Sequence, residues 1–174
     1  HNQKPRLVFA TNNMHKFSEI KQVIENSVDL LCLTDIGFSG EIPEEKDTLE
    51  GNAAQKAMHI YNNFGLDCFA DDTGLEIDAL HGEPGVYSAR YAGSDCSFED
   101  NMKLVLNKLK GINNRKARFR TVIALAENGV LSFFYGEIQG IITSEKRGEK
   151  GFGYDPIFVP DGFDATFAEM TLEE

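Results

Sequence analysis

Two adjacent carboxylates, Asp71 and Asp72, follow the short apolar run 68–70 and precede Thr73 and Gly74. Like charges a few ångströms apart repel, so the pKa of one carboxyl group rises unless a cation lies between them. A hard divalent cation with oxygen ligands, such as Mg²⁺, relieves that repulsion. Neighbours in a strand point to opposite faces, but Gly74 would permit a bend that lets both carboxylates face one ion. The pair therefore predicts either a metal site or an acidic turn at the surface.

A second polar group, Thr11, Asn12 and Asn13, follows the apolar run 6–10. Asn13 is a typical residue to cap a helix, and the free N–H groups at a helix N-terminus bind phosphate. Lys16 falls in the first turn of that helix, where the helix dipole does not favour a cation. This placement indicates a functional role for Lys16, with a solvated surface lysine as the alternative.

A third candidate cation, Lys56, lies on a predicted helix that begins at a capping box in residues 47–50 and ends at Gly65. Apolar residues at helical spacing define one face of this helix. Lys56 falls off the centre of that face, so it can reach a cleft beside the helix. The preceding loop, residues 34–47, is rich in acidic residues and is typical of a solvated loop.

Near the end of the sequence, two aromatic residues and a carboxylate surround a glycine in the run Phe152, Gly153, Tyr154 and Asp155. Aromatic rings can stack on a planar base while a carboxylate bonds to its edge, and the same residues can equally form a packed corner. Taken together, the three polar turns suit a nucleotide. One can hold phosphate, one a metal ion and one a base.

Length and composition set broad limits on the function. A chain of 174 residues suits one domain, or one domain with two lobes. The net charge of -11 disfavours a nucleic-acid binder, which needs a basic face. No apolar run reaches the length of a membrane span, and no signal peptide pattern opens the sequence. The three cysteines stand far apart, which fits reduced thiols in a cytosol, so we expect a cytoplasmic protein with no membrane partner.

Strand-like and helix-like segments alternate along the first two thirds of the sequence, and hairpins follow. The dipeptide Asn128-Gly129 is a strong hairpin signal. This order predicts an α/β or α+β domain with a mixed sheet. We expect strands near residues 6–10, 28–33, 75–79, 117–126, 130–143 and 157–159, and helices near 13–24, 47–64 and 97–109.

Five stretches resemble the inosine triphosphate pyrophosphatase family, and they occur in the order typical of that family. They are A-T-N-N-x-x-K at 10–16, N-A-x-x-K-A at 52–57, D-D-T-G-L at 71–75, P-G-V-Y-S-A-R-Y at 84–91 and G-F-G-Y-D-P at 151–156. The combination is highly specific, and the resemblance covers residues 7–174. The family hydrolyses deaminated purine nucleoside triphosphates such as ITP, dITP and XTP. The resemblance implies Mg²⁺-dependent cleavage between the α- and β-phosphates, which gives a monophosphate and pyrophosphate.

The resemblance also implies an α/β fold with an elongated mixed β-sheet flanked by helices. It implies two lobes with an active-site cleft between them, and a homodimer. The whole of residues 1–174 would form one nucleoside-triphosphate pyrophosphatase domain that cleanses the nucleotide pool. Two other readings stay open: a pyrophosphatase for other modified nucleotides, and a nucleotide-binding module without turnover.

By position, the resemblance assigns roles to individual residues. Asp72 would activate the attacking water and bind the metal ion, with Glu44 and Asp71 as further metal ligands. The substrate contacts would come from Thr11, Asn12, Asn13, Lys16, Lys56, Thr73, Phe152, Gly153, Tyr154 and Asp155, with Ser88 and Arg90 as second-tier candidates.

One departure from the family pattern concerns the last residues. Family members usually continue beyond Leu172-Glu173-Glu174 with a lysine and a Ser-His-Arg motif that contacts the substrate. Here the sequence stops at Glu174, so we expect a tail that is either truncated or not shown. Base selection is expected to depend on it.

Overall fold

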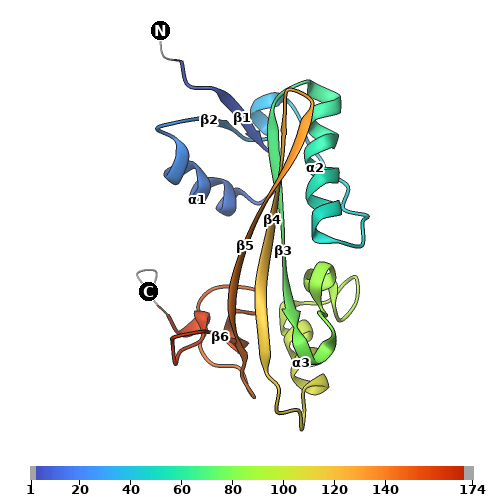
Figure 1. Cartoon of the computed structure of the whole chain (residues 1–174), viewed down its shortest axis with the longest axis vertical. Coiled ribbons are helices and arrows are strands. Elements are labelled where there is room, and N and C mark those ends of the chain that lie inside the picture. The colour runs from blue at the N-terminus through green and yellow to red at the C-terminus, as the bar shows by residue number, and fades with distance from the viewer. Residues whose placement is uncertain (1–2, 171–174) are drawn as a thin grey trace. The chain divides into compact units, whose positions relative to one another are not determined.

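The computed structural model describes residues 3–170, and its centre is one six-stranded mixed sheet (Figure 1). The strand order is β2-β1-β3-β4-β5-β6. β1 runs parallel to β2 and β3, whereas β5 runs antiparallel to β6. The predicted α/β fold with a mixed sheet is therefore confirmed. The strands are β1 (Arg6–Phe9), β2 (Asp29–Leu31), β3 (Cys68–Ile77), β4 (Lys116–Glu127), β5 (Val130–Ile142) and β6 (Phe158–Pro160).

Three α-helices accompany the sheet: α1 (Met14–Ile24), α2 (Leu49–Phe64) and α3 (Phe98–Lys108). α1 and α3 begin after the predicted caps, Asn13 and Ser97, each of which accepts a hydrogen bond from a backbone N–H of the first turn. α2 begins one residue later than the capping box at 47–50 predicts, because Thr48 caps it by accepting from the N–H of Gly51. Among residues 3–170, no helix combines the length and the apolar character needed to cross a membrane.

The strand β3 differs from its prediction. Residues 71–74 were expected to turn or bend, but they continue as regular strand from Cys68 to Ile77. Gly74 does not form a bend but allows the backbone of Gly85 to approach β3 closely, since a side chain at position 74 would clash with the backbone carbonyl of Gly85. The prediction of an acidic surface turn at Asp71 and Asp72 is therefore wrong, because Asp71 is buried within the strand.

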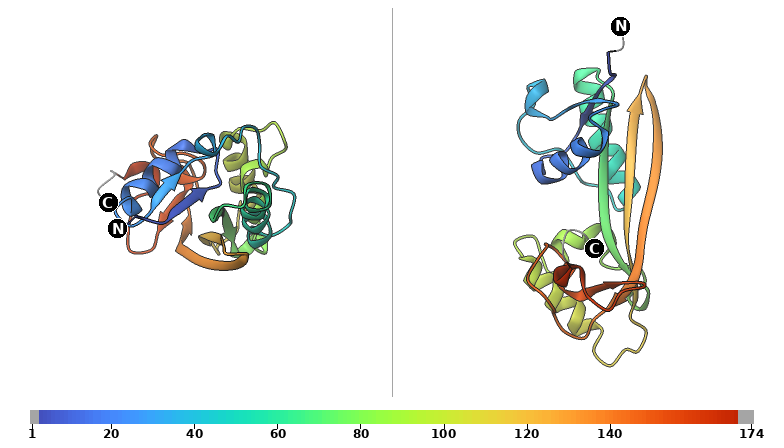
Figure 2. Two further views of the ribbon diagram at one scale, coloured as in Figure 1. Left: turned by 90° about the horizontal axis from the view of Figure 1, so that it is seen from above. Right: turned by 90° about the vertical axis from the view of Figure 1, so that its left-hand side faces the viewer.

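The chain divides into two compact units, and the boundary within β3 falls between Asp72 and Thr73. Unit 1 comprises the chain up to Asp72 together with Val122–Tyr135. In this unit α1 and α2 lie on opposite faces of β1, β2 and β3 (Figure 2). The crossover from β1 to β2 and the crossover from β2 back past β1 to β3 run in opposite directions along the sheet. Right-handed crossovers in opposite directions place their helices on opposite faces. Its core includes the stacked rings of Phe9 and Phe69, whose centroids are 4.4 Å apart.

Unit 2 comprises Thr73–Thr121 together with the chain from Gly136 onward. Its core joins the last residues of β3 to the apolar face of α3 and to β6. Leu75, Val105 and Phe158 are fully buried members of this core. It fixes the relative positions of α3, the 3-10 turn Gly85–Arg90 and the loop that leads into β6.

Candidate active site

In unit 1, the two neighbouring carboxylates of β3 have different surroundings. The Nζ atom of Lys16 lies 2.7 Å from Oδ2 of Asp71, which balances that buried charge. Asp72 is different, because its Oδ2 atom is buried and has no hydrogen-bond partner within residues 3–170. Burial raises the pKa of Asp72 to about 6, and Lys56 partly offsets this rise. The arrangement leaves Asp72 as a carboxylate with a free, desolvated oxygen.

Lys56 of α2 forms an ion pair with Glu44, with 2.7 Å between Nζ and Oε1. The acidic loop before α2 is attached to the helix by two side chains. Asn52 accepts a hydrogen bond from the backbone N–H of Lys46 at 2.8 Å, and Gln55 accepts one from Glu45 at 2.8 Å. Glu44 is therefore brought to Lys56 by a loop bound to α2, where sequence alone indicates only a solvated loop.

Asn52 is a residue of this site that the sequence reasoning did not assign. Its side chain is buried, its Oδ1 atom holds the backbone N–H of Lys46, and its amide lowers the pKa of Asp72. The sequence feature that could have identified Asn52 is its place in the motif at 52–57, four residues before Lys56. Asn52 thus lies between the loop and Asp72 of β3, and its oxygen holds the loop.

The polar turn before α1 has the predicted cap. Oδ1 of Asn13 accepts a hydrogen bond from the N–H of Lys16 at 3.1 Å, and Oγ1 of Thr11 accepts one from the N–H of Asn13 at 3.0 Å. The side chain of Asn12 donates to the carbonyl oxygen of Gly40 at 3.0 Å. Thr11, Asn12, Asn13 and Lys16 thus belong to one short turn, and their binding of phosphate stays a prediction.

The residues around Asp72 include oxygen ligands suited to a divalent cation. The free oxygen of Asp72 is a suitable ligand, and both Lys56 and Glu44 are close enough to influence its pKa. Residues 3–170 present no cluster of three or more potential metal-ligating side chains. Mg²⁺ commonly takes only one or two carboxylates and completes its shell with phosphate oxygens and water. The site therefore fits an ion that arrives with a phosphorylated ligand.

In unit 2, the predicted residues of the 84–91 stretch and of β3 have structural partners. The hydroxyl oxygens of Thr73 and Thr121 are 2.8 Å apart. Oγ of Ser88 accepts from the N–H of Leu75 at 2.9 Å and donates to the carbonyl of Gly85. Ser88 therefore holds its turn against β3. The guanidinium of Arg90 lies 5.2 Å from the centre of the Tyr87 ring.

The loop that contains Phe152–Asp155, called the glycine-rich loop below, combines the two predicted alternatives, a packed corner and an exposed ring that can stack on a base. Tyr154 is only 3% exposed, and its hydroxyl donates to the carbonyl of Ser88 at 2.6 Å, so it belongs to a packed corner. Phe152 is 66% exposed, which leaves its ring free to meet a ligand. Asp155 accepts a hydrogen bond from the N–H of Phe152 at 3.1 Å, and burial raises the pKa of its carboxyl group. Gly153 lies between them with a positive φ of 63°.

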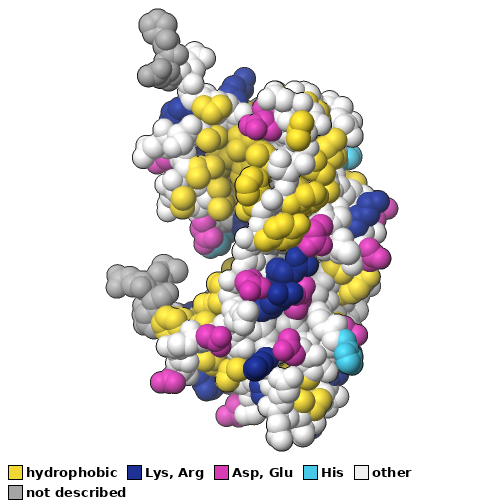
Figure 3. Space-filling model, in the orientation of Figure 1, with side chains coloured by type: hydrophobic (Ala, Val, Ile, Leu, Met, Phe, Trp, Pro, Cys, Tyr) yellow, Lys and Arg dark blue, Asp and Glu magenta, His cyan; other side chains and the backbone are white. Residues whose placement is uncertain are grey.

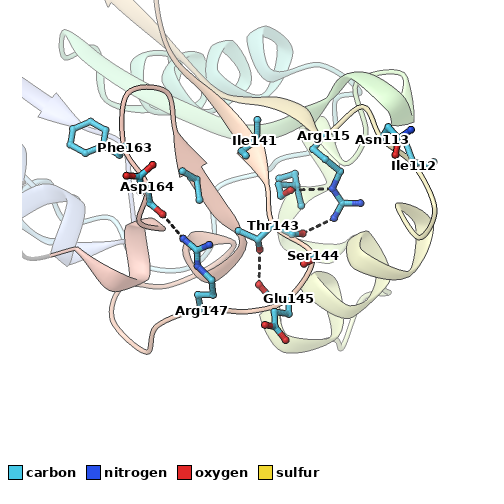
Figure 4. A pocket seen from close by; sticks show the side chains of 12 residues that line it. Ile112, Asn113, Arg115, Ile141, Thr143, Ser144, Glu145, Arg147, Phe163 and Asp164 are labelled. Atoms are coloured by element: carbon cyan, nitrogen blue, oxygen red, sulfur yellow. Dashed lines mark hydrogen bonds between the residues drawn. The ribbon is translucent and has the colours of Figure 1, made fainter.

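A pocket of about 570 Å³ in unit 2 contains none of the predicted site residues (Figure 4). Arg115 crosses one side of it and donates to the carbonyl oxygens of Leu109, Ile142 and Thr143. Arg147, on the other side, donates to the carbonyl of Asp164 and pairs with a carboxylate. Because both guanidinium groups are engaged in this way, the pocket does not suit a polyphosphate.

The expected continuation after Leu172-Glu173-Glu174 lies outside the residues that the structure describes.

The comparisons with known proteins agree over nearly the whole chain. The model of the Ham1 family matches residues 7–174. The dITP/XTP pyrophosphatase of Flavobacterium johnsoniae is 52% identical over 168 residues, which cover 97% of this chain and 88% of that protein. The solved structure of the Staphylococcus aureus Ham1 protein is similar with a TM-score of 0.89 and 38% identity, over 97% of this chain and 88% of the other. A HAM1 protein from Coxiella burnetii has a TM-score of 0.91 at 35% identity, over the same shares of the two chains.

Proposed function

This chain belongs to the Ham1 family, and on that premise we propose that it hydrolyses non-standard purine nucleoside triphosphates. The substrates are ITP, dITP and XTP, and the products are the nucleoside monophosphate and pyrophosphate. The single observation that carries the proposal is Asp72, a half-buried carboxylate whose buried Oδ2 atom lacks a hydrogen-bond partner within residues 3–170. The names of its relatives as dITP/XTP pyrophosphatases support the same substrate class.

Asp72 is proposed to orient the attacking water and to accept its proton. Its raised pKa of about 6 makes it a stronger base than an ordinary aspartate and leaves it ionised at neutral pH. Water attacks the α-phosphorus, the bond to the bridging oxygen breaks, and pyrophosphate leaves. Lys16 and Lys56 balance the charge of the phosphates and of the departing pyrophosphate. Positioning and electrostatics of this kind supply most of the catalysis of phosphoryl transfer.

A Mg²⁺ ion is the proposed cofactor, held by Asp72 and Glu44 with Asp71 as a further candidate. When bound, it would neutralise phosphate charge and polarise the reacting phosphoryl group. The ion pairs of Asp71 with Lys16 and of Glu44 with Lys56 indicate that these carboxylates already lie beside cationic groups. Each lysine would then be free to move from its carboxylate to a phosphate oxygen.

The base is proposed to lie against the loop Phe152–Asp155. Hypoxanthine and xanthine carry an oxygen acceptor at position 6, where adenine carries an amino donor. A buried donor that meets this oxygen would face another donor in adenine, and buried sites penalise such a mispairing strongly. We therefore expect ATP to be a poor substrate.

We further propose a homodimer that acts in the cytoplasm. The support for the dimer is the set of large apolar side chains on β5 of unit 1 that remain exposed in the single chain. Exposed apolar surface can mark an interaction site.

The decisive experiment measures pyrophosphate release from a panel of triphosphates with Mg²⁺ present. The panel includes ITP, dITP, XTP and ATP, together with methylated purine and modified pyrimidine nucleotides. Preferential cleavage of the deaminated purines supports the proposal. Preference for another modified nucleotide would shift the substrate class, and binding without any pyrophosphate release would leave only a nucleotide-binding module.

The role of Asp72 is tested by the variant Asp72→Asn, which keeps the shape of the side chain and removes its basicity. We expect turnover to fall by about 10²–10⁴-fold, the usual contribution of a general base. Asp78→Asn is the matched control, because Asp78 is an exposed carboxylate just after β3. Near-normal turnover in a folded Asp72→Asn protein would refute the role.

A further inference from the structure

Phe98 is an exposed aromatic residue at the first position of α3, and no role has been assigned to it above. It follows the N-cap Ser97, and 38% of its surface is exposed. Its ring meets the ring of Tyr154 edge to face, with 5.7 Å between centroids and an interplanar angle of 85°. A Cβ atom placed on Gly153 would lie 3.5 Å from the Phe98 ring. One side of the ring therefore packs on the glycine-rich loop, and the remainder is open.

The position of Phe98 is fixed by buried polar contacts at the start of α3. Asn101 is fully buried, and its Nδ2 atom donates to the carbonyl oxygens of Ser88 and Ala89 at 3.3 and 3.2 Å. Its Oδ1 atom accepts from the N–H of Ala92 at 2.8 Å. These bonds attach the first turn of α3 to the 84–91 stretch, so Phe98 does not depend on a mobile loop for its placement.

The same first turn is also attached to the glycine-rich loop. Glu99 pairs with Lys146, which precedes that loop. The hydroxyl of Tyr154 bonds to the carbonyl of Ser88, the same carbonyl that Asn101 contacts. The start of α3, the 84–91 stretch and the glycine-rich loop therefore form one rigid corner of unit 2, with Phe98 at its surface.

Within this corner, Phe98 and Phe152 have exposed rings, and the ring of Tyr154 is enclosed. Tyr154 is enclosed, whereas Phe98 and Phe152 keep 38% and 66% of their surfaces exposed. The exposed ring of Phe98 lies beside the backbone of the loop that is proposed to bind the base. A flat heteroaromatic ring can stack on such an aromatic surface. Such stacking is tolerant of the base, because every base presents a π-face.

We propose that Phe98 forms part of the surface that binds the purine base, with its exposed side packed against the ring system of the nucleotide. This inference rests on the proposed function and adds a substrate-contacting residue to it. Because stacking does not read the edge of a base, Phe98 supplies affinity for purine nucleotides over bare polyphosphates. Discrimination between deaminated and ordinary purines is left to other groups.

The test uses the absence of tryptophan from this sequence. Phe98→Trp places a single fluorescent reporter at the proposed contact, and stacked purines quench indole emission. The protein is titrated with inosine monophosphate and, separately, with inorganic pyrophosphate, both without divalent metal. We expect saturable quenching by the nucleotide and little change with pyrophosphate. Phe163→Trp is the control, since Phe163 is 50% exposed in the same unit but lines the unrelated pocket.

Steady-state kinetics of Phe98 variants distinguish a role in base binding from a purely structural role. Phe98→Ala is expected to raise KM for dITP by about 10-fold or more, as loss of a stacking ring does elsewhere, while kcat changes by less than about twofold. Phe98→Tyr keeps the ring and should restore KM, whereas Phe98→Leu keeps only apolar bulk and should not. Urea unfolding of each variant confirms that it is folded.

The outcomes distinguish this inference from the proposed function. If inosine monophosphate quenches the fluorescence of Phe98→Trp but no triphosphate releases pyrophosphate, the base contact is supported and the proposed pyrophosphatase activity is overturned. Normal pyrophosphate release with no saturable quenching would overturn the role of Phe98 alone. Equal quenching by pyrophosphate, or an unchanged KM in folded Phe98→Ala, would also overturn it.

Discussion

At Asp72, burial opposes the charge that the proposed reaction needs. The pKa of this carboxyl rises from 3.8 to about 6 chiefly because burial penalises the ionised form. Below about pH 4 the group is neutral in both folded and unfolded protein, so burial costs little. Above pH 6 it is ionised in both states, and the folded protein alone bears the cost of desolvation. Asp72 therefore destabilises the metal-free protein as pH rises from about 4 to 6.

This linkage gives a prediction for Asp72→Asn that is independent of turnover. The neutral side chain should raise the free energy of unfolding at pH 8 by about 1–2 kcal/mol, reduced from the full linkage value because the group is partly exposed. The gain should vanish near pH 4. Urea unfolding of metal-free protein at the two pH values measures it, with Asp78→Asn as control. An equal gain at both pH values would contradict the ionisation argument.

Some of these residue roles follow from sequence and others need the fold. The unfavourable position of Lys16 in the first turn of α1 indicates a functional role, but it does not identify the partner with which Lys16 forms an ion pair. That partner, Asp71, lies 55 residues away and belongs to another element, so only the packed sheet reveals the pair. The double role of Asn52 is hidden for the same reason, since a buried amide has no distinctive pattern in a sequence.

Among the elements, the helices were the easiest to predict and β3 the hardest. Cap residues act within three positions of the helix they begin, so Asn13, Thr48 and Ser97 identify their helices locally. The run from Asp71 to Gly74 indicates a turn by local preference, but pairing with neighbouring strands keeps it extended. Strand preference depends on neighbours more than helix preference does.

Gly74 provides a test of how β3 approaches the turn that contains Ser88. A methyl group at this position would clash with the backbone carbonyl of Gly85, which cannot move as a flexible side chain can. We expect Gly74→Ala to lower the free energy of unfolding by about 1–3 kcal/mol, as overpacking typically does. The matched control is Gly136→Ala in β5, where a Cβ atom meets nothing within 4 Å. Thermal unfolding should separate the two variants, and equal stability would show that the turn at Gly85 yields.

On the scale of the whole molecule, β5 presents an apolar surface that unit 1 does not cover. Val130, Phe134 and Tyr135 are exposed by more than half, and Phe133 by 37%. Figure 3 shows apolar side chains gathered at the end of the molecule that carries the β4–β5 turn. β6 pairs with β5 only at Gly140–Ile142. The sequence predicts the strand, but it does not predict which of its side chains stay exposed, because that depends on the three-dimensional neighbours.

A second copy of the chain is the partner proposed for this surface, although the net charge of -11 makes two chains repel. Apolar contact must therefore supply the attraction, and a charge placed on Phe134 should abolish it. We expect the unaltered chain to show about twice its 19.4 kDa mass by light scattering and Phe134→Asp to show the mass of one chain. Phe163→Asp, which charges an equally exposed ring in unit 2, should remain dimeric. A dimer that persists in Phe134→Asp would exclude Phe134 from the interface, because a buried unpaired carboxylate would not be tolerated there.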